Sequence, residues 1–321
     1  MHAITMKQRM AHGVVLFVAA TVIVLGPSAA AAVQEVTDPA YYEMPTPVVP
    51  AAQIARYGHP SQLSLQSSVA LVLDEREGVV LLAHNIDEQR SIASLTKLMT
   101  AVVTLDANLP FDKMIEITPA DGDHRKGTSS RLRYGSVLTR YHTLLVALAA
   151  SDNRAAAALA RTYPGGYDAM IAAMNAKAWG LGMLNSRYVD PTGLDYGNVS
   201  TARDLAKLIT ATRDYALLHS LSTRREFLVT DWRADREIVF RNTNFLLHKD
   251  SWNIVLSKTG YTAAAGKCLL IETTVANRPL LIVLLNSWGE LGRYGDSDRI
   301  RNWLWATEHK IQTLHRTFAS Y

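Results

Sequence analysis

Strand patterns stand at both ends of the folded part of this chain, with helical patterns between them. Residues 67–85 (SSVALVLDEREGVVLLAHN) predict a hairpin of two short strands around a polar turn at 75–78. Three more strands are predicted over NIVLSKTGYT (253–262), KCLLIETTV (267–275) and LLIVLLNS (280–287). Because strands from both ends can share one antiparallel sheet, we expect an α+β fold with helices flanking that sheet.

The sequence between these ends is predicted to form an all-helical middle region. Leu95, Leu98, Met99, Val102 and Leu105 recur at the spacing of one helical face. Further helices are predicted over 138–150, 153–162, 167–180 and 201–212, and a last amphipathic helix over 300–311. The pattern contains no internal repeat and no sign of a second domain.

The amino-terminal 32 residues are typical of a secretory signal peptide. Lys7 and Arg9 precede the apolar run 13–25, and Ala30-Ala31-Ala32 forms an A-x-A cleavage site. An uncleaved membrane anchor is the alternative, but the run is shorter than the ~18 to 20 residues needed to span a bilayer. We therefore expect an exported protein.

Residues 33–64 are rich in proline and show little periodicity, which predicts an extended linker or wrapping arm. The folded domain is expected to cover 65–321. With 48% hydrophobic and 19% charged residues, the chain can bury a substantial core. Cys268 is the single cysteine, so no intramolecular disulfide can form, and its apolar surroundings favour a buried thiol over a reactive one.

Ser94 and Lys97, in SIASLTKLMT, lie three positions apart where the first helix begins. At helical spacing their side chains share a face, so the lysine amine can reach the serine hydroxyl. Lysine can activate a serine nucleophile if desolvation or nearby positive charge lowers its pKa, and the N–H of a serine that begins a helix points toward a developing oxyanion. However, S-x-x-K arises by chance about once in a chain of this size, so alone it favours a capping serine and a solvated lysine.

Two more motifs follow. Ser151-Asp152-Asn153 lies at the predicted corner between two helices, where it can present a hydroxyl and an amide into a cleft, or simply cap the second helix. Lys258-Thr259-Gly260 lies on a predicted strand, and K-T-G is expected by chance in fewer than about one chain in ten. Its lysine can bind a substrate carboxylate, and its glycine allows a ligand backbone to approach closely. The alternative is a purely structural role, as a strand with a glycine bulge.

In the order S-x-x-K, S-D-N, K-T-G, these motifs are the signature of penicillin-binding proteins and serine β-lactamases. More narrowly, the chain resembles the type 7 low-molecular-mass penicillin-binding proteins, which are D-alanyl-D-alanine endopeptidases. The likeness covers roughly residues 65–310 and includes SSRLRYGSVLTRYHTLLVALAASDNRAAAALARTYPGG, PTGLDYGNVSTARDLAKL and FRNTNFLLHKDSWNIVLSKTGYTAAAGKCLL. It implies a serine β-lactamase/transpeptidase-like fold and a periplasmic peptidase that cuts D-alanyl to meso-diaminopimelate cross-bridges of peptidoglycan and is acylated by β-lactams.

The resemblance also implies roles for the catalytic residues. Ser94 is expected to be the acyl-ester nucleophile and Lys97 its proton acceptor. Ser151 would relay a proton to the leaving amine, and Asn153 would hold Lys97 and the substrate amide. Lys258 would bind the substrate carboxylate or polarise Ser151.

The remaining expected residues belong to the oxyanion hole and the substrate-binding strand. The backbone N–H groups of Ser94 and Tyr261 would form the oxyanion hole. The substrate-binding residues are expected to be Lys258, Thr259, Gly260 and Thr262.

Three alternatives stay open. A class A β-lactamase needs a second carboxylate to activate the deacylating water, and RYVDPTGLDYGN offers only Asp190 and Asp195, of which Asp190 suits a turn. A D-alanine carboxypeptidase is the nearer alternative, although such relatives often carry an extra carboxyl-terminal β domain that we do not expect here. The third is a cell-wall sensor module that binds penicillin without turnover.

Neither a cofactor nor a metal is predicted, because the ten histidines form no H-E-x-x-H or other compact ligand spacing. The formal charge of +4 falls to +2 once Lys7 and Arg9 leave with the signal peptide, since residues 1–32 contain no acidic residue. Without a basic cluster interleaved with aromatic residues, we expect no nucleic-acid partner. A monomer is the default expectation.

Overall fold

The structure is a computed structural model that describes residues 49–123 and 128–319. The expected signal peptide and the first half of the expected arm, to residue 48, lie outside these residues. Within the described ranges, no helix combines the length and the apolar character needed to cross a membrane.

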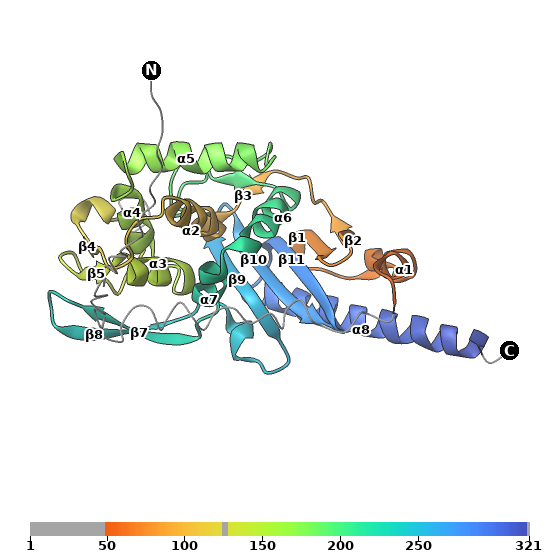
Figure 1. Ribbon diagram of the computed structural model, residues 1–321. Coiled ribbons are helices and arrows are strands. Elements are labelled where there is room, and N and C mark those ends of the chain that lie inside the picture. Colours follow the sequence, from red (N-terminus) through yellow and green to blue (C-terminus); the bar gives the residue numbers. More distant parts are fainter. Residues whose placement is uncertain (1–48, 124–127, 320–321) are drawn as a thin grey trace, which may run out of the picture. The chain divides into compact units, whose positions relative to one another are not determined.

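A five-stranded antiparallel sheet joins the two ends of the chain, in the order β2-β1-β11-β10-β9 (Figure 1). Its central pairing sets Val69 of β1 opposite Leu285 of β11, which confirms the predicted sharing of one sheet. The predicted hairpin and the three carboxyl-terminal strands are also confirmed. The strand bounds are β1 Ser67–Asp74, β2 Val79–His84, β9 Asn253–Thr262, β10 Gly266–Val275 and β11 Arg278–Ser287.

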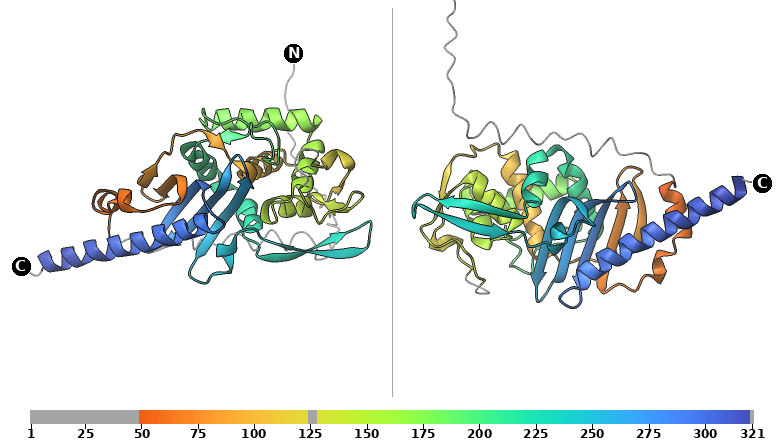
Figure 2. Two further views of the ribbon diagram at one scale, coloured as in Figure 1. Left: turned by 180° about the vertical axis from the view of Figure 1, so that it is seen from behind. Right: turned by 90° about the horizontal axis from the view of Figure 1, so that it is seen from below.

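Helices cover both faces of this sheet, so its strands are buried on both sides. Val69 and Leu71 of β1 pack with α2–α7, whereas Ala70 and Val72, which point the other way, pack with α1 and α8. Figures 1 and 2 show α8 along one face of the sheet and α2–α7 on the opposite face. The helix bounds are α1 Ala51–Tyr57, α2 Thr96–Asp106, α3 Arg140–Ala149, α4 Asn153–Arg161, α5 Gly166–Gly180, α6 Ala202–Thr210, α7 Ala216–Ser222 and α8 Gly292–Ala319.

The prediction of an all-helical middle region is wrong. Three two-stranded antiparallel sheets lie there, β3-β6, β4-β5 and β7-β8, and strands of two or three residues are too short to show a period of two in the sequence. The longer β7-β8 hairpin alternates in burial, with Val229, Ile238 and Phe240 buried. Its sequence hides this period, because the exposed neighbours Leu228 and Val239 are apolar as well. The strand bounds are β3 Arg90–Ser91, β4 Met114–Glu116, β5 Val137–Thr139, β6 Val199–Ser200, β7 Glu226–Asp231 and β8 Arg236–Arg241.

The extended conformation expected up to residue 64 is wrong for its described part. Residues 51–57 form α1, with Ile54 fully buried, and a short 3-10 helix, η2, covers Pro60–Gln62. The first N–H of α1, from Ala51, donates to the carboxylate of Glu77 at 2.9 Å and 3.0 Å. Because this cap comes from the β1-β2 turn, no local sequence signal announces the helix. The last helix, α8, also extends beyond the predicted 300–311 at both ends.

Candidate active site

Ser94 lies in a short 3-10 turn, η3 (Ala93–Leu95), that leads into α2. The residue before it, Ala93, has a left-handed backbone with φ of +47°, which is uncommon for a residue with a side chain. Lys97 follows within the first turn of α2, and its Nζ lies 3.0 Å from Ser94 Oγ. The contact that the S-x-x-K spacing predicts is therefore present.

The Lys97 amine is buried, with 1% of the residue exposed, in a helix whose residues 96–104 are all buried. It donates hydrogen bonds to Asn153 Oδ1 at 2.7 Å and to the backbone oxygen of Thr192 at 2.6 Å. Burial lowers the pKa of Lys97 to about 8, although the carboxylates of Asp190 and Asp152 act in the opposite direction. A neutral amine has two N–H groups and one lone pair. With both N–H groups donated to these oxygens, the lone pair remains for the Ser94 hydroxyl.

Ser151 and Asp152 form the corner between α3 and α4. Ser151 has a left-handed backbone, with φ of +58°. Asp152 is the N-cap of α4, since its Oδ1 accepts from the N–H of Ala155 at 3.0 Å, and its Oδ2 accepts from Ser130 Oγ at 2.6 Å. The capping role of this motif is thus carried by Asp152, which leaves the Ser151 hydroxyl available for another partner.

Asn153 links the second motif to the first. Its Nδ2 donates to Thr128 Oγ1 at 2.9 Å, while its Oδ1 accepts from Lys97. These two bonds fix which end of the amide faces the lysine. Thr128 belongs to none of the three motifs, so sequence reasoning did not select it.

The third motif contributes Lys258, which contacts Ser151 of the second motif. Lys258 points from β9 toward the α3–α4 corner, where its Nζ lies 2.8 Å from Ser151 Oγ and also donates to Thr259 O at 3.0 Å. Burial, and secondarily the positive charges of Lys97 and Arg293, lower the pKa of Lys258 well below its usual value. The hydrogen bonds therefore bring together the four expected catalytic residues and the substrate-binding Lys258. They form two sets: Ser94 with Lys97 and Asn153, and Ser151 with Lys258.

The other strand residues have mixed surroundings. Thr259 Oγ1 lies 2.6 Å from Thr243 Oγ1, and Thr262 Oγ1 accepts from the N–H of Ala265 at 3.1 Å, within the β9-β10 turn. The Tyr261 side chain is 60% exposed and lies against the ammonium of Lys267. None of these contacts engages the backbone N–H expected at Tyr261 for the oxyanion hole, and that role stays a prediction.

Gly260 allows β9 to approach η3. A Cβ at this position would lie 3.0 Å from Ile92 O and 3.2 Å from Ser94 N. The space beside this glycine is thus filled by the backbone that carries Ser94. The strand reaches Ser94 closely because residue 260 has no side chain.

Two further features were missed by sequence reasoning. The guanidinium of Arg293, at the start of α8, donates to Gly260 O at 2.9 Å and to Cys268 O at 3.1 Å. The Thr192 carbonyl that accepts from Lys97 is a backbone group, and a motif specifies side chains only, so this contact could not be predicted from a motif. Its loop is organised by Asp190, whose carboxylate accepts from the N–H groups of Gly193 and Asp195 at 2.7 Å and 2.6 Å, so the expected turn role of Asp190 is confirmed.

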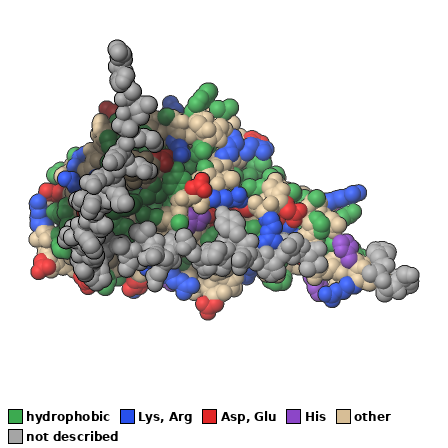
Figure 3. Space-filling view, viewed as in Figure 1, with side chains coloured by type: hydrophobic (Ala, Val, Ile, Leu, Met, Phe, Trp, Pro, Cys, Tyr) green, Lys and Arg blue, Asp and Glu red, His purple; other side chains and the backbone are tan. Residues whose placement is uncertain are grey.

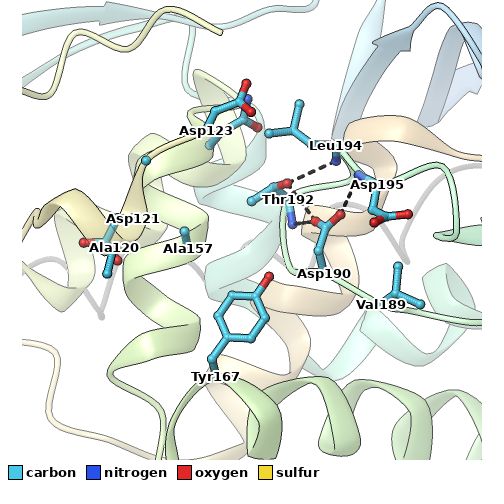
Figure 4. A pocket seen from close by; sticks show the side chains of 12 residues that line it. Ala120, Asp121, Asp123, Ala157, Tyr167, Val189, Asp190, Thr192, Leu194 and Asp195 are labelled. Atoms are coloured by element: carbon cyan, nitrogen blue, oxygen red, sulfur yellow. Dashed lines mark hydrogen bonds between the residues drawn. The ribbon is translucent and has the colours of Figure 1, made fainter. Parts of the chain in front are cut away.

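A cavity of about 370 Å³ opens beside Asn153 and Thr192. Figure 4 shows Tyr167 of α5 and Asp190 projecting toward this space, with Asp190 bonded to its own loop. The cavity adjoins the hydrogen-bonded set and offers room for part of an extended peptide. In the described ranges, no three His, Cys, Asp or Glu side chains come together as a metal site would require.

Comparisons with known proteins agree with this geometry. Residues 57–289 match the model of a family described as D-alanyl-D-alanine carboxypeptidase, Peptidase_S11. The chain is 46% identical over 244 residues to the D-alanyl-D-alanine endopeptidase of Escherichia coli, covering 76% of this chain and 79% of the relative. It is 47% identical over 256 residues to the D-alanyl-D-alanine endopeptidase of Pseudomonas aeruginosa, covering 80% and 83%.

More distant similarities extend to other proteins of this kind. D-alanyl-D-alanine carboxypeptidase DacC of Escherichia coli is 31% identical over 256 residues, covering 75% of this chain and 61% of the relative. Among solved structures, the Streptomyces K15 DD-transpeptidase superposes with a TM-score of 0.70 at 25% identity, covering 76% of this chain and 98% of that one. A D-alanyl-D-alanine carboxypeptidase from Mycobacterium tuberculosis gives 0.68 at 26% identity, covering 76% and 92%.

Proposed function

This chain belongs to the D-alanyl-D-alanine carboxypeptidase family, Peptidase_S11, and from that premise we propose that it is a DD-endopeptidase of peptidoglycan. It is a serine-type hydrolase, and its substrate on this proposal is the D-alanyl to meso-diaminopimelate cross-bridge. The observation that carries the proposal is the joining of three distant motifs by hydrogen bonds among Ser94, Lys97, Asn153, Ser151 and Lys258.

The proposed acylation begins with proton transfer from Ser94 Oγ to the neutral Lys97 amine. Ser94 Oγ attacks the D-alanyl carbonyl carbon, and the backbone N–H groups of Ser94 and Tyr261 bind the resulting oxyanion. As the carbon–nitrogen bond breaks, Ser151 donates its proton to the leaving amine and recovers the proton that Lys97 took up. Lys258 keeps the Ser151 hydroxyl in place at 2.8 Å and supplies positive charge for the substrate carboxylate.

Hydrolysis of the acyl-enzyme needs water. Water adds to the ester carbonyl and gives one proton to Lys97, and Ser94 regains a proton as the ester bond breaks. A β-lactam acylates Ser94 by the same first step. The geometry disfavours a β-lactamase, because the carboxylate of Asp190 already binds backbone N–H groups of its own loop and Asp195 Oδ1 accepts from Gly197 N at 2.8 Å.

Sequence similarity favours the endopeptidase over the carboxypeptidase. The two named endopeptidases are 46% and 47% identical to this chain, whereas the named carboxypeptidase DacC is 31% identical. We expect the protein to convert cross-linked dimeric muropeptides to monomers, as measured by mass spectrometry of the digest. The control is protein pre-treated with penicillin, which must leave the dimer intact. Release of terminal D-alanine from monomers, with intact dimer, would instead establish the carboxypeptidase.

The acylation rate is expected to rise with pH. Protonated Lys97 has no lone pair to accept the Ser94 proton, so only the neutral amine is active, and its pKa is about 8. The rate constant for acylation by penicillin should increase about tenfold per pH unit below pH 8 and level off above it. Labelling time courses between pH 6 and 9.5 measure this rise and plateau of the rate constant, and circular dichroism verifies folding at each pH. A flat profile across this range would show that Lys97 is not the base.

We propose that the protein works in the periplasm as a monomer, on peptidoglycan peptides. The signal-peptide pattern supports export, and the naming of its relatives as D-alanyl-D-alanine endopeptidases supports the peptide substrate. On the face shown in Figure 3, acidic and basic side chains lie interspersed, which matches the low net charge and gives no reason to propose a nucleic-acid partner.

A further inference from the structure

The 3-10 turn that carries Ser94 is held between two glycines from distant parts of the chain. Gly260 of β9 approaches it from one side, and a Cβ there would lie 3.0 Å from Ile92 O. Gly193, in the loop after Asp190, approaches from another. A Cβ at Gly193 would fall well inside contact distance of the Ala93 carbonyl and 2.8 Å from Ser94 N.

The atoms facing Gly193 all belong to one peptide unit, which joins Ala93 to Ser94. These are backbone atoms, so they cannot rotate away from an added methyl group as the end of a side chain would. The same peptide unit carries the Ser94 N–H that the proposed mechanism uses for the oxyanion. Ala93 already has a left-handed backbone, so the unit depends on its surroundings to keep that conformation.

The loop that presents Gly193 is fixed by its own hydrogen bonds. The Asp190 carboxylate accepts from the N–H groups of Thr192, Gly193 and Asp195, and the N–H of Leu194 donates to Thr192 Oγ1 at 3.1 Å. Thr192 O in turn accepts from Lys97 Nζ. A larger residue at 193 would therefore displace the Ala93–Ser94 peptide unit and not merely the loop.

We propose that Gly193 is a positioning residue for the nucleophile, because its missing side chain seats the Ala93–Ser94 peptide unit and aims the Ser94 N–H. The proposal rests on the proposed acyl-enzyme function of Ser94. It concerns the acylation step, which penicillin and a D-alanyl peptide share. Its outcome does not depend on which D-alanyl bond the protein cuts.

The test compares Gly193→Ala with Gly182→Ala as a matched control. Both glycines have a left-handed backbone, with φ of +84° and +69°, so alanine carries a comparable backbone cost at both positions. They differ in space, because a Cβ at Gly182 meets nothing within 4 Å. Any difference between the two variants therefore reports the collision with the Ala93–Ser94 unit.

We expect Gly193→Ala to lower the first-order acylation rate constant for fluorescent penicillin about 100-fold, the size of effect of a misplaced oxyanion donor. Gly182→Ala should stay within about threefold of wild type. A positioning role predicts slow labelling that still reaches one penicillin per molecule by mass spectrometry. A merely structural role predicts a smaller labelled fraction at an unchanged rate constant, and that result would overturn the proposal.

Gly260→Ala keeps the proposal testable if Gly193→Ala does not fold. Its Cβ would meet the same turn at 3.0–3.2 Å, a milder collision, so its rate constant should lie between those of the other two variants. Equal rate constants for Gly260→Ala and Gly182→Ala would then reject the proposal that close glycine contacts position the Ala93–Ser94 peptide unit. Failure of the proposed function would show separately, as wild-type protein that penicillin does not label at Ser94.

Discussion

Replacing Lys97 with methionine is expected to lower the rate constant of acylation by penicillin by roughly four to six orders of magnitude, as loss of the base does in serine peptidases. Methionine has a similar length and suits a buried position, so the fold should persist. The substitution removes the amine that lies 3.0 Å from Ser94 Oγ and leaves Asn153 Oδ1 and Thr192 O without their donor. Labelling with fluorescent penicillin over hours to days measures the remaining rate.

Lys249→Met is the matched control for this prediction. The Lys249 side chain is 35% exposed and its ammonium pairs with Asp298 at 3.1 Å, so its loss removes a surface charge without touching the three motifs. Its acylation rate constant should remain within about twofold of wild type. If the acylation rate constant of Lys97→Met stayed within tenfold of wild type, Lys97 would not be the base. The next candidate would be Lys258, which contacts Ser151.

The side chains of the candidate site could be predicted, but the backbone that supports them could not. The Ser94 to Lys97 contact follows from helical spacing alone. The Ser151 to Lys258 contact joins residues 107 positions apart, and only the resemblance to a known family brought them together. Thr192 O and the missing side chain of Gly193 act through backbone geometry, which a motif does not encode.

The fold shows a similar division. The main sheet was predictable because strands of eight to ten residues, such as β1 and β9, display a clear apolar pattern. Helix α1 was not predictable, because its cap is the Glu77 side chain, 26 positions away, and the local sequence is rich in proline. The sequence pattern therefore predicted the elements that carry a clear local signal, and missed those whose only signal is a distant tertiary contact.

Arg278→Met is expected to lower the free energy of unfolding by about 3–5 kcal/mol, the usual cost of breaking a buried ion pair. Arg278 is 1% exposed, and its guanidinium contacts Asp74 at 2.5 Å, Glu77 at 3.3 Å and Glu308 at 3.4 Å. It also donates to Val49 O, ahead of α1. Methionine would fill the volume but leave these carboxylates facing one another without a cation. Denaturant unfolding followed by circular dichroism measures the loss.

The surface pair of Arg241 with Glu226 gives the control for this stability prediction. Arg241 is 73% exposed, so Arg241→Met should change the free energy of unfolding by less than about 1 kcal/mol. Burial raises the pKa of Glu308 and Arg278 acts against that rise, so removing Arg278 should raise this pKa further. Part of the loss would then be recovered at pH 5, where Glu308 can take up a proton and shed its charge. A loss that is equal at pH 5 and pH 8 would show that uncompensated charge is not its cause.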